Sequence, residues 1–331
     1  MITLTFTCGD INGIGPEICI KTINSIYNPA DRKIVLFCPA KVFENAASKS
    51  LVSFDHEILK EVNPINLNAE IVTIVDLGES KQNIGKPTKE SGRVSLVALK
   101  KAFELVNFKN ADAIITAPIS KTALKLAGIK YPGQTELLAD LSKTKNYLMM
   151  FLSEQFICAL ATIHEPIKNV SKLLSRKLVR SSLKVLIQTL QQDLGIADPK
   201  IAVLGLNPHA GENGKIGQEE IESIRPAINS FKNNLVEGPF VPDAFFANQL
   251  HKTYNAVLGM YHDQVLIPFK MMNFNSGVNF SAGLPIIRTS PDHGTAFDIA
   301  DNGIADSASM IEAVKWAETI ISNRRRIKSA R

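Results

Sequence analysis

Short apolar runs of β-type residues alternate with longer amphipathic stretches along almost the whole chain. Strands are expected at 2–8, 33–38, 70–75, 112–117, 147–152, 155–163, 200–206 and 255–261. Helices are expected at 15–26, 89–107, 133–142, 175–194, 219–231, 243–252 and 309–325. This alternation predicts an α/β fold with a mainly parallel sheet that is covered on both faces.

A chain of 331 residues is long for one domain. We expect a first, discontinuous domain made of 1–135 plus 289–331, and a second domain made of 136–288. Residues are 45% hydrophobic and 21% charged, which is typical of a globular protein with a sizeable core. No apolar stretch approaches the roughly 20 residues of a membrane helix.

The N-terminal segment and the cysteines point to a cytoplasmic protein. The segment MITLTFTCGD lacks the basic start of a signal peptide and is expected to be a first strand. The four cysteines form no C-x-x-C pair and lie in or beside apolar runs, so buried reduced thiols are expected.

The formal net charge of +5 comes from the C-terminal tail. Its five basic residues are Arg324, Arg325, Arg326, Lys328 and Arg331. We interpret this tail as the solvated end of a helix, where cations suit the helix dipole. Because no basic face with interleaved aromatic residues occurs elsewhere, nucleic-acid binding is not expected.

Three of the expected β-type segments run into a histidine. These segments are FICALATIH, IAVLGLNPH and AVLGMYH, which end at His164, His209 and His262. The carboxyl edge of an open α/β sheet is where ligands bind, and imidazole is a common metal ligand. A single histidine here would be an ordinary hydrogen-bonded loop residue. Three in the same context leave two explanations open, such loop residues or the ligands of a metal site with open positions.

Three loops carry further polar candidates. The first, GDINGIGPE at 9–17, joins a strand to a helix, but it is not the G-x-G-x-x-G fingerprint. In TAPISK, Ser120 is a plausible N-cap, and YPGQTE opens the next helix with Thr135 near an anion-attracting helix start. Capping alone is the other explanation of Thr135.

Three polar residues follow His262 in apolar surroundings. They are Lys270 in PFKMM, Asn279 in GVNFS and Arg288 in PIIRTS. Each alone would be a surface residue beside the core. Together they favour an anion pocket, because lysine and arginine are the usual partners of a phosphate or carboxylate.

Taken together, these segments closely resemble the 4-hydroxythreonine-4-phosphate dehydrogenase family, usually called PdxA, of pyridoxal-phosphate biosynthesis. The motifs that carry the resemblance follow one another in family order: GDINGIGPE, TAPISK, GQTE, ATIHEP, GLNPHAGENG, MYHDQ, GVN and GLPIIRTSPDHGTAFDIA. The first and last also look like the GDGIGPE and HGSAPDIAG loops of isopropylmalate and isocitrate dehydrogenases. The resemblance implies two α/β/α domains of that type, with the active site in the interdomain cleft.

The resemblance also implies roles for individual residues. His164, His209 and His262 would bind a divalent metal, with one of them reaching in from the partner of a homodimer. Thr135, Lys270, Asn279 and Arg288 would bind the phosphorylated substrate. His293, Gly294 and Thr295 would lie against the adenosine of NAD or NADP, at a non-Rossmann site.

One residue departs from the family pattern. Histidine usually precedes the threonine of this motif, and here the residue is Gln134. Glutamine can donate a hydrogen bond to a phosphate oxygen but cannot become cationic, so weaker phosphate binding or a different substrate end is expected.

The expected reaction is oxidation of 4-phosphooxy-L-threonine at C3 by NAD, followed by decarboxylation, with zinc, cobalt, magnesium or manganese. Lys121 and Asp263 are candidate bases, although Asp263 could equally orient His262. The alternatives are a dehydrogenase of another four-carbon phosphorylated hydroxy acid, a dehydrogenase of an aromatic dihydrodiol, a three-histidine zinc hydrolase, and a non-catalytic binding protein.

Overall fold

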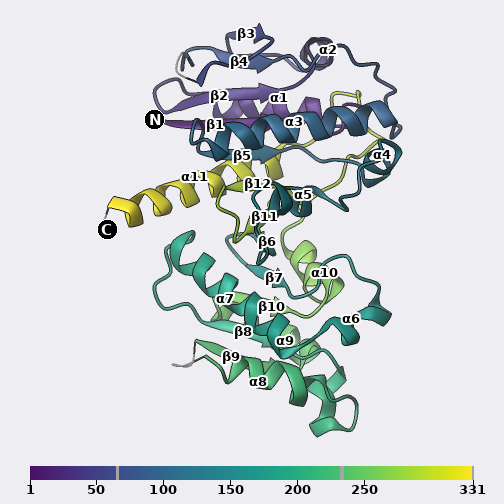
Figure 1. Cartoon of the computed structure of the whole chain (residues 1–331), viewed down its shortest axis with the longest axis vertical. Helices are drawn as coiled ribbons and strands as arrows, with labels where there is room; N and C mark the ends of the chain where they lie inside the picture. The colour runs from purple at the N-terminus through teal and green to yellow at the C-terminus, as the bar shows by residue number, and fades with distance from the viewer. Residues whose placement is uncertain (65–66, 232–234, 330–331) are drawn as a thin grey trace. The chain divides into compact units, whose positions relative to one another are not determined.

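A computed structural model of the chain describes residues 1–64, 67–231 and 235–329. The chain divides into two compact units (Figure 1). Unit 1 comprises Met1–Lys143 and Leu284–Ile321, and unit 2 comprises Thr144–Gly283 and Ser322–Arg331. The domain limits expected from the sequence, with their assigned roles, remain predictions.

Unit 1 is built on a parallel sheet. In sheet order, its described strands are β3 (His56–Leu59), β4 (Val72–Val75), β2 (Arg32–Phe37), β1 (Ile2–Thr7), β5 (Ala113–Thr116) and β12 (Arg288–Pro291). The pairs are in parallel register; Leu4 lies beside both Ile34 and Ala113. The central strands are buried on both faces, as expected for a parallel sheet covered by helices.

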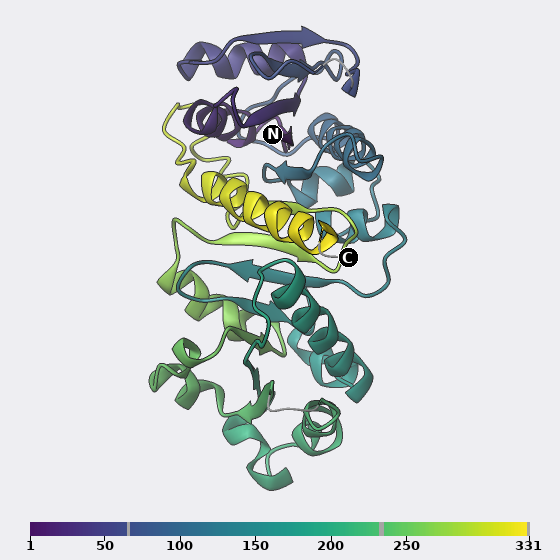
Figure 2. The same cartoon turned by 90° about the vertical axis from the view of Figure 1, so that its left-hand side faces the viewer.

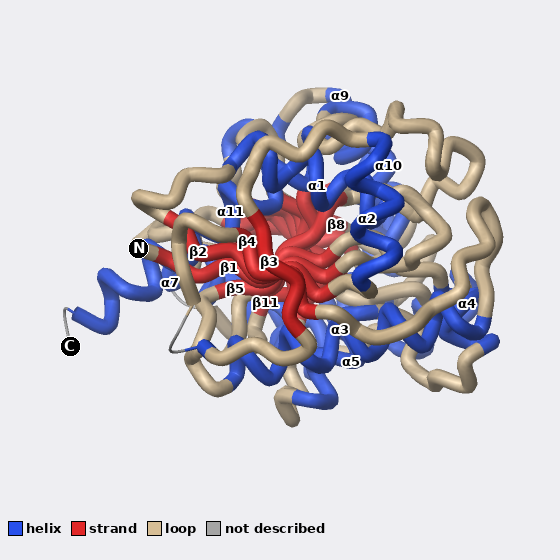
Figure 3. Tube along the Cα trace, turned by 90° about the horizontal axis from the view of Figure 1, so that it is seen from above, coloured by secondary structure: helices blue, strands red, loops and turns tan. Residues whose placement is uncertain are grey.

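The helices of unit 1 cover both faces of this sheet. They are α1 (Gly15–Ile26), α2 (Ala40–Lys49), α3 (Lys89–Asn107), α4 (Lys121–Leu126), α5 (Gln134–Leu141) and α11 (Ala308–Ser329), whose last turns belong to unit 2. Figure 3 shows α1 and α2 on one side of the strands and α3 on the other. Pro16 suits the first turn of α1, and Thr88 and Ser91 form a capping box at the start of α3.

Unit 2 has a mixed sheet. In sheet order, its described strands are β11 (Val278–Ala282), β6 (Leu148–Leu152), β7 (Cys158–Leu160), β10 (Ala256–Gly259), β8 (Ile201–Leu204) and β9 (Val236–Phe240). Strand β6 runs antiparallel to β11 and β7, and the remaining pairs are parallel. The expectation of a mainly parallel sheet is therefore confirmed, with β6 as the exception.

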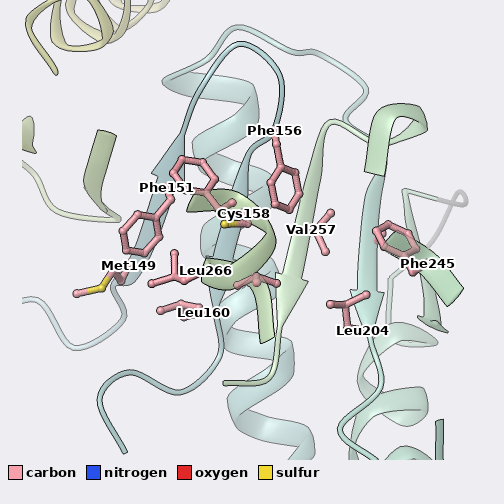
Figure 4. Close-up of a cluster of buried hydrophobic side chains, with 12 residues drawn as sticks. Met149, Phe151, Phe156, Cys158, Leu160, Leu204, Phe245, Val257 and Leu266 are labelled. Atoms are coloured by element: carbon pink, nitrogen blue, oxygen red, sulfur yellow. The ribbon is translucent and has the colours of Figure 1, made fainter. Parts of the chain in front are cut away.

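The helical segments of unit 2 are mostly short. They are α6 (Ile167–Leu173), α7 (Arg176–Gln192), η2 (Pro208–Gly214), η3 (Glu220–Ile224), α8 (Arg225–Ile228), α9 (Pro242–Ala247), η4 (Leu250–Thr253) and α10 (His262–Met272). Figures 1 and 2 show α7 and α10 on opposite sides of the strands. Between them, Phe151, Phe156, Val257 and Leu266 belong to a buried cluster of apolar side chains (Figure 4).

Several sequence expectations need correction. The strand expected over 155–163 is only Cys158–Leu160, because Ser153 and Phe156 form a hydrogen-bonded turn before it. The helix expected over 219–231 is a π-helical segment followed by the short α8, and the one over 243–252 is α9 followed by η4.

The basic tail is not purely solvated, because the Arg324 guanidinium donates to both carboxylate oxygens of Asp193 at 2.6 and 3.1 Å. Arg331 lies outside the described residues. No helix in the part of the chain that the structure describes is long and apolar enough to cross a membrane.

The cysteines are as expected. All four are buried free thiols, and burial raises the pKa of Cys19 and Cys38 well above the ordinary thiol value. Thiols of this kind are poor nucleophiles. We therefore assign them to the core of the fold and not to its chemistry.

Candidate active site

The three histidines follow three neighbouring parallel strands of unit 2. His164 comes after β7, His209 after β8 and His262 after β10, which lies between the other two in the sheet. The carboxyl ends of parallel strands meet at one edge. The expectation that these residues follow strand ends at one sheet edge therefore agrees with the topology.

Two of the three imidazoles lie close together. The ring centroids of His164 and His262 are 5.6 Å apart, and the ring planes are inclined by 37°. Two imidazoles on one tetrahedral ion would have centroids about 5 Å apart, given metal–nitrogen bonds of about 2.0–2.1 Å. The pair therefore suits a shared cation.

His262 is oriented by its neighbour in the chain. Its Nδ1 and Oδ1 of Asp263 are 2.7 Å apart, at the start of α10. A proton on Nδ1 that is held by a carboxylate leaves Nε2 unprotonated, which is the tautomer that a metal ligand requires. The chemistry of the donors thus fits a cation such as zinc or cobalt.

His209 is exposed and lies in an unusual turn. Residues 209–213 all have positive φ, from 44° at Glu212 to 79° at Gly211. A left-handed conformation costs L-residues about 1–2 kcal/mol each, and such strain clusters at functional sites. Among the described residues of one chain, no three His, Cys, Asp or Glu side chains are grouped closely enough to hold an ion.

The phosphate candidates of unit 1 are buried. Thr135 is the second residue of α5 and is not its N-cap, which is Gly133. Arg288, on β12, is almost fully buried, and its Nε donates to Oγ1 of Thr116 at 2.9 Å. Burial lowers the pKa of Arg288 to about 10, against the opposing effect of the Glu136 carboxylate. The guanidinium therefore stays cationic at neutral pH.

Gln134 is the first residue of α5 and directly precedes Thr135. It is buried, and its Nε2 donates to the carbonyl oxygen of Ala117 at 3.1 Å. No donor among the described residues reaches its Oε1. The amide is thus tied to the loop that precedes α4, where Ser120 is the N-cap, as expected.

The other candidates lie elsewhere in the two units. Lys270 is exposed in the last turn of α10, and Asn279 is half-buried on β11 opposite Phe151. Lys121 is exposed at the start of α4.

The loop from His293 to Thr295 packs against the first loop of unit 1. The Thr295 carbonyl accepts the Ile14 N–H at 3.0 Å, and a Cβ on Gly13 would be 2.6 Å from that oxygen. Space within 4 Å of the missing Cβ of Gly294 is open. The fold therefore brings together the two segments that resemble the loops of isocitrate and isopropylmalate dehydrogenases.

The sequence model of the family described as "Pyridoxal phosphate biosynthetic protein PdxA" matches residues 30–317. The chain belongs to the PdxA family. A protein of Sulfurihydrogenibium sp. strain YO3AOP1, named 4-hydroxythreonine-4-phosphate dehydrogenase, is 38% identical over 96% of this chain and 98% of its own length. The family resemblance and the expectation of a dehydrogenase are thus confirmed.

Solved structures agree with PdxA family membership. The crystal structure of 4-hydroxythreonine-4-phosphate dehydrogenase from Klebsiella pneumoniae superposes with a TM-score of 0.82 at 35% identity, covering 97% of this chain and 98% of that one. Isocitrate dehydrogenase from Methylococcus capsulatus matches with a TM-score of 0.52 at 14% identity, covering 100% of this chain and 89% of that one. The second match concerns the fold alone, and the expected fold class is confirmed.

Sequence reasoning missed one contributor to the site. Thr116 accepts the hydrogen bond from Arg288 and lies at the end of β5, which is in register with β12. The quoted motif TAPISK contains this threonine, but nothing in the sequence pairs it with a residue 172 positions away. Strand pairing supplies that link.

Proposed function

We propose that this chain catalyses NAD- or NADP-dependent oxidation of 4-phosphooxy-L-threonine (4-hydroxythreonine 4-phosphate) in pyridoxine 5′-phosphate biosynthesis. The product, 2-amino-3-oxo-4-(phosphooxy)butanoate, then loses CO₂ to give 3-amino-2-oxopropyl phosphate. The names of full-length relatives support this substrate. The observation that carries the proposal is the paired imidazoles of His164 and His262 with the carboxylate of Asp263.

We assign the divalent cation to His164, His209 and His262. The chemistry that the bound groups supply is hydride acceptance by the nicotinamide and stabilisation of negative charge on the C3 oxygen by the cation, which also favours loss of CO₂. His262 would bind through Nε2, because Asp263 holds Nδ1. Zinc and cobalt suit three nitrogen donors better than magnesium or manganese does.

The phosphate is assigned to Thr135, Lys270, Asn279 and Arg288. Arg288 brings a buried, charged fork that recognises two phosphate oxygens at once. Lysine adds a point charge, and the hydroxyl and amide add hydrogen bonds. A phosphorylated substrate therefore fits this set better than an aromatic diol, which carries no anion.

The proton on the C3 hydroxyl needs a base. Lys121 and Asp263 are the proposed candidates. The contact with His262 engages Oδ1 of Asp263, which favours an orienting role for this carboxylate and leaves Lys121 as the base. The loop of His293, Gly294 and Thr295 is proposed to contact the adenosine of the nicotinamide cofactor.

We further propose a cytoplasmic homodimer in which His209 serves the partner's site. An apolar patch on unit 2 supports association between copies. On α10, Ile267 and Met271 are 59% and 82% exposed, and Phe274, just beyond the helix, is 86% exposed. Exposed apolar groups in helical spacing, here on the helix that begins at His262, are typical of a protein interface.

The test is NADH formation from 4-phosphooxy-L-threonine by the dimer, with and without a chelator. Activity that a chelator removes and that zinc, cobalt, manganese or magnesium restores supports the proposal. His209→Ala should abolish turnover with an unchanged circular dichroism spectrum, and His56→Ala, in exposed strand β3, should leave it normal. Near-normal NADH formation by His209→Ala would refute the proposal, and phosphate release without NAD reduction would indicate a hydrolase.

A further inference from the structure

Glu220 is a buried residue that is hydrogen-bonded to the loop that carries His209. It is the first residue of the π-helical segment η3 and is 1% exposed. Its Oε1 accepts the backbone N–H groups of Leu206 and Asn207, both at 2.8 Å. Its Oε2 accepts Nδ2 of Asn207 at 2.9 Å. All three bonds reach the two residues that precede Pro208.

Two glycines of the 205–214 loop pack closely against the Glu220 carboxylate. A Cβ added to Gly211 would lie 2.7 Å from Oε2, and one added to Gly205 would lie 3.2 Å from Oε1. Gly205 and Gly211 are the positions at which the chain approaches Glu220 from either side of His209. Glycine is needed at Gly211 for a second reason, its φ of +79°.

A buried carboxylate is retained only where donors replace its water shell. Here the donors belong to the stretch before His209, and the left-handed run of residues 209–213 begins directly after it. Such a run does not persist unless its surroundings determine it. π-Helical turns like the one that begins at Glu220 also occur frequently at functional sites.

We propose that Glu220 is a positioning residue, which holds the 205–214 loop so that the exposed His209 imidazole is presented to the metal. The inference rests on the proposed metal site, and it adds a residue that does not touch the metal. Preorganisation of this kind determines how tightly a ligand set binds its ion.

Glu220→Gln tests this inference in the intact dimer. The variant keeps one oxygen for the two backbone N–H groups but turns an N–H group toward the amide nitrogen of Asn207. We expect the dissociation constant for Co²⁺, measured by titrating metal-free protein and following visible absorption, to rise about 10- to 100-fold. The cobalt spectrum should approach that of His209→Ala, and excess metal should restore part of kcat without changing the KM for NAD.

Two further variants separate positioning from general stability. Glu222→Gln makes the same chemical change two residues along, on an exposed side chain, and should bind Co²⁺ like the wild type. Gly211→Ala keeps the glutamate but places a Cβ 2.7 Å from its Oε2, so it should displace the carboxylate and weaken Co²⁺ binding to a similar extent. It keeps the test valid if Glu220→Gln fails to fold.

The double variant His209→Ala/Glu220→Gln gives the sharpest readout. If Glu220 acts through His209, the double variant binds Co²⁺ no more weakly than His209→Ala alone. Additive losses, or wild-type affinity in Glu220→Gln, would overturn the inference while leaving the metal site in place. Wild-type protein that binds no Co²⁺ would overturn the proposed function as well.

Discussion

A single carboxylate next to His262 decides which of the two imidazole nitrogens is available to a ligand. Asp263 is exposed, and its contact with Nδ1 of His262 contributes little to folding. The contact matters for ligand binding, because a His262 side chain fixed in one tautomer offers one unprotonated nitrogen. Orientation and stability can therefore be separated experimentally at this residue.

Asp263→Asn should weaken metal binding about 10- to 100-fold, because an amide holds the imidazole less firmly and does not raise its basicity. Cobalt titration measures the affinity, and urea unfolding should show a change of less than about 0.5 kcal/mol. Asp243→Asn, another exposed acid at the start of a helix, is the matched control. Equal cobalt affinities in the two variants would contradict the orienting role.

Arg288→Lys should raise the KM for the phosphorylated substrate roughly tenfold, about 1.4 kcal/mol. Lysine keeps the charge but loses the fork and the Nε bond to Thr116. Steady-state kinetics at pH 7.5 measures the change, and the KM for NAD should stay constant. Thr116→Ser, which retains the accepting hydroxyl, serves as the control; a parallel rise in both KM values would point to a misfolded protein.

Gln134→His restores the residue that is usual in the family. Glutamine donates to Ala117 and stays neutral, whereas imidazole gains a proton below a pKa of about 6.5. We expect the substrate KM to fall about three- to tenfold at pH 6 and less at pH 8. A KM that does not respond to pH in the variant would show that this position does not contact the phosphate.

At the scale of elements, the sequence predicts best where the apolar periodicity is strong. The expected helices at 15–26 and 89–107 match α1 and α3 to the residue. Strand β12 has the sequence RTSP, and all four residues are buried. This strand was missed because three polar residues and a proline show no alternation of apolar and polar side chains. Helix α10 was missed for two reasons. Pro268 lies inside it, and apolar residues such as Ile267 and Met271 lie on its exposed side, so the sequence shows no separate apolar and polar faces.

In the candidate site, too, some features follow from local sequence pattern and others do not. Strand ends near His164, His209 and His262 follow from local pattern, and their shared edge follows from parallel pairing. That His164 contacts His262, and that Arg288 contacts Thr116, depends on strand order, which local pattern does not encode. The left-handed run of residues 209–213 was also beyond prediction, because such strain is set by the surrounding structure and not by residue type.

Close packing between α3 and α4 gives a prediction at this scale. A Cβ at Gly92 would be 2.1 Å from the carbonyl oxygen of Ala123, which is backbone and cannot move aside alone. Gly92→Ala should therefore lower the free energy of unfolding by about 1–3 kcal/mol, despite the better helix propensity of alanine. Urea denaturation measures it against Lys100→Ala, an exposed position on α3 that should change stability by less than about 0.5 kcal/mol.

At the scale of the whole molecule, the question is which subunit receives His209. The described residues of one chain pair His164 with His262 but group no third ligand with them. In a twofold dimer, a residue that serves the partner's site is exchanged reciprocally. Mixed dimers can therefore distinguish a shared site from one that a single chain completes by itself.

Co-expression of His209→Ala with His262→Ala tests this exchange. If His209 crosses to the partner, a mixed dimer contains one site with all three imidazoles and one site that lacks two of them. Random pairing makes about half of the dimers mixed, so about a quarter of wild-type activity should return, although each variant alone is inactive. If His209 completes the site of its own chain, every site in the mixture lacks a ligand and no activity returns. Separating mixed dimers by two affinity tags should raise the recovered activity to about half, and the cobalt bound per dimer should follow the same proportion.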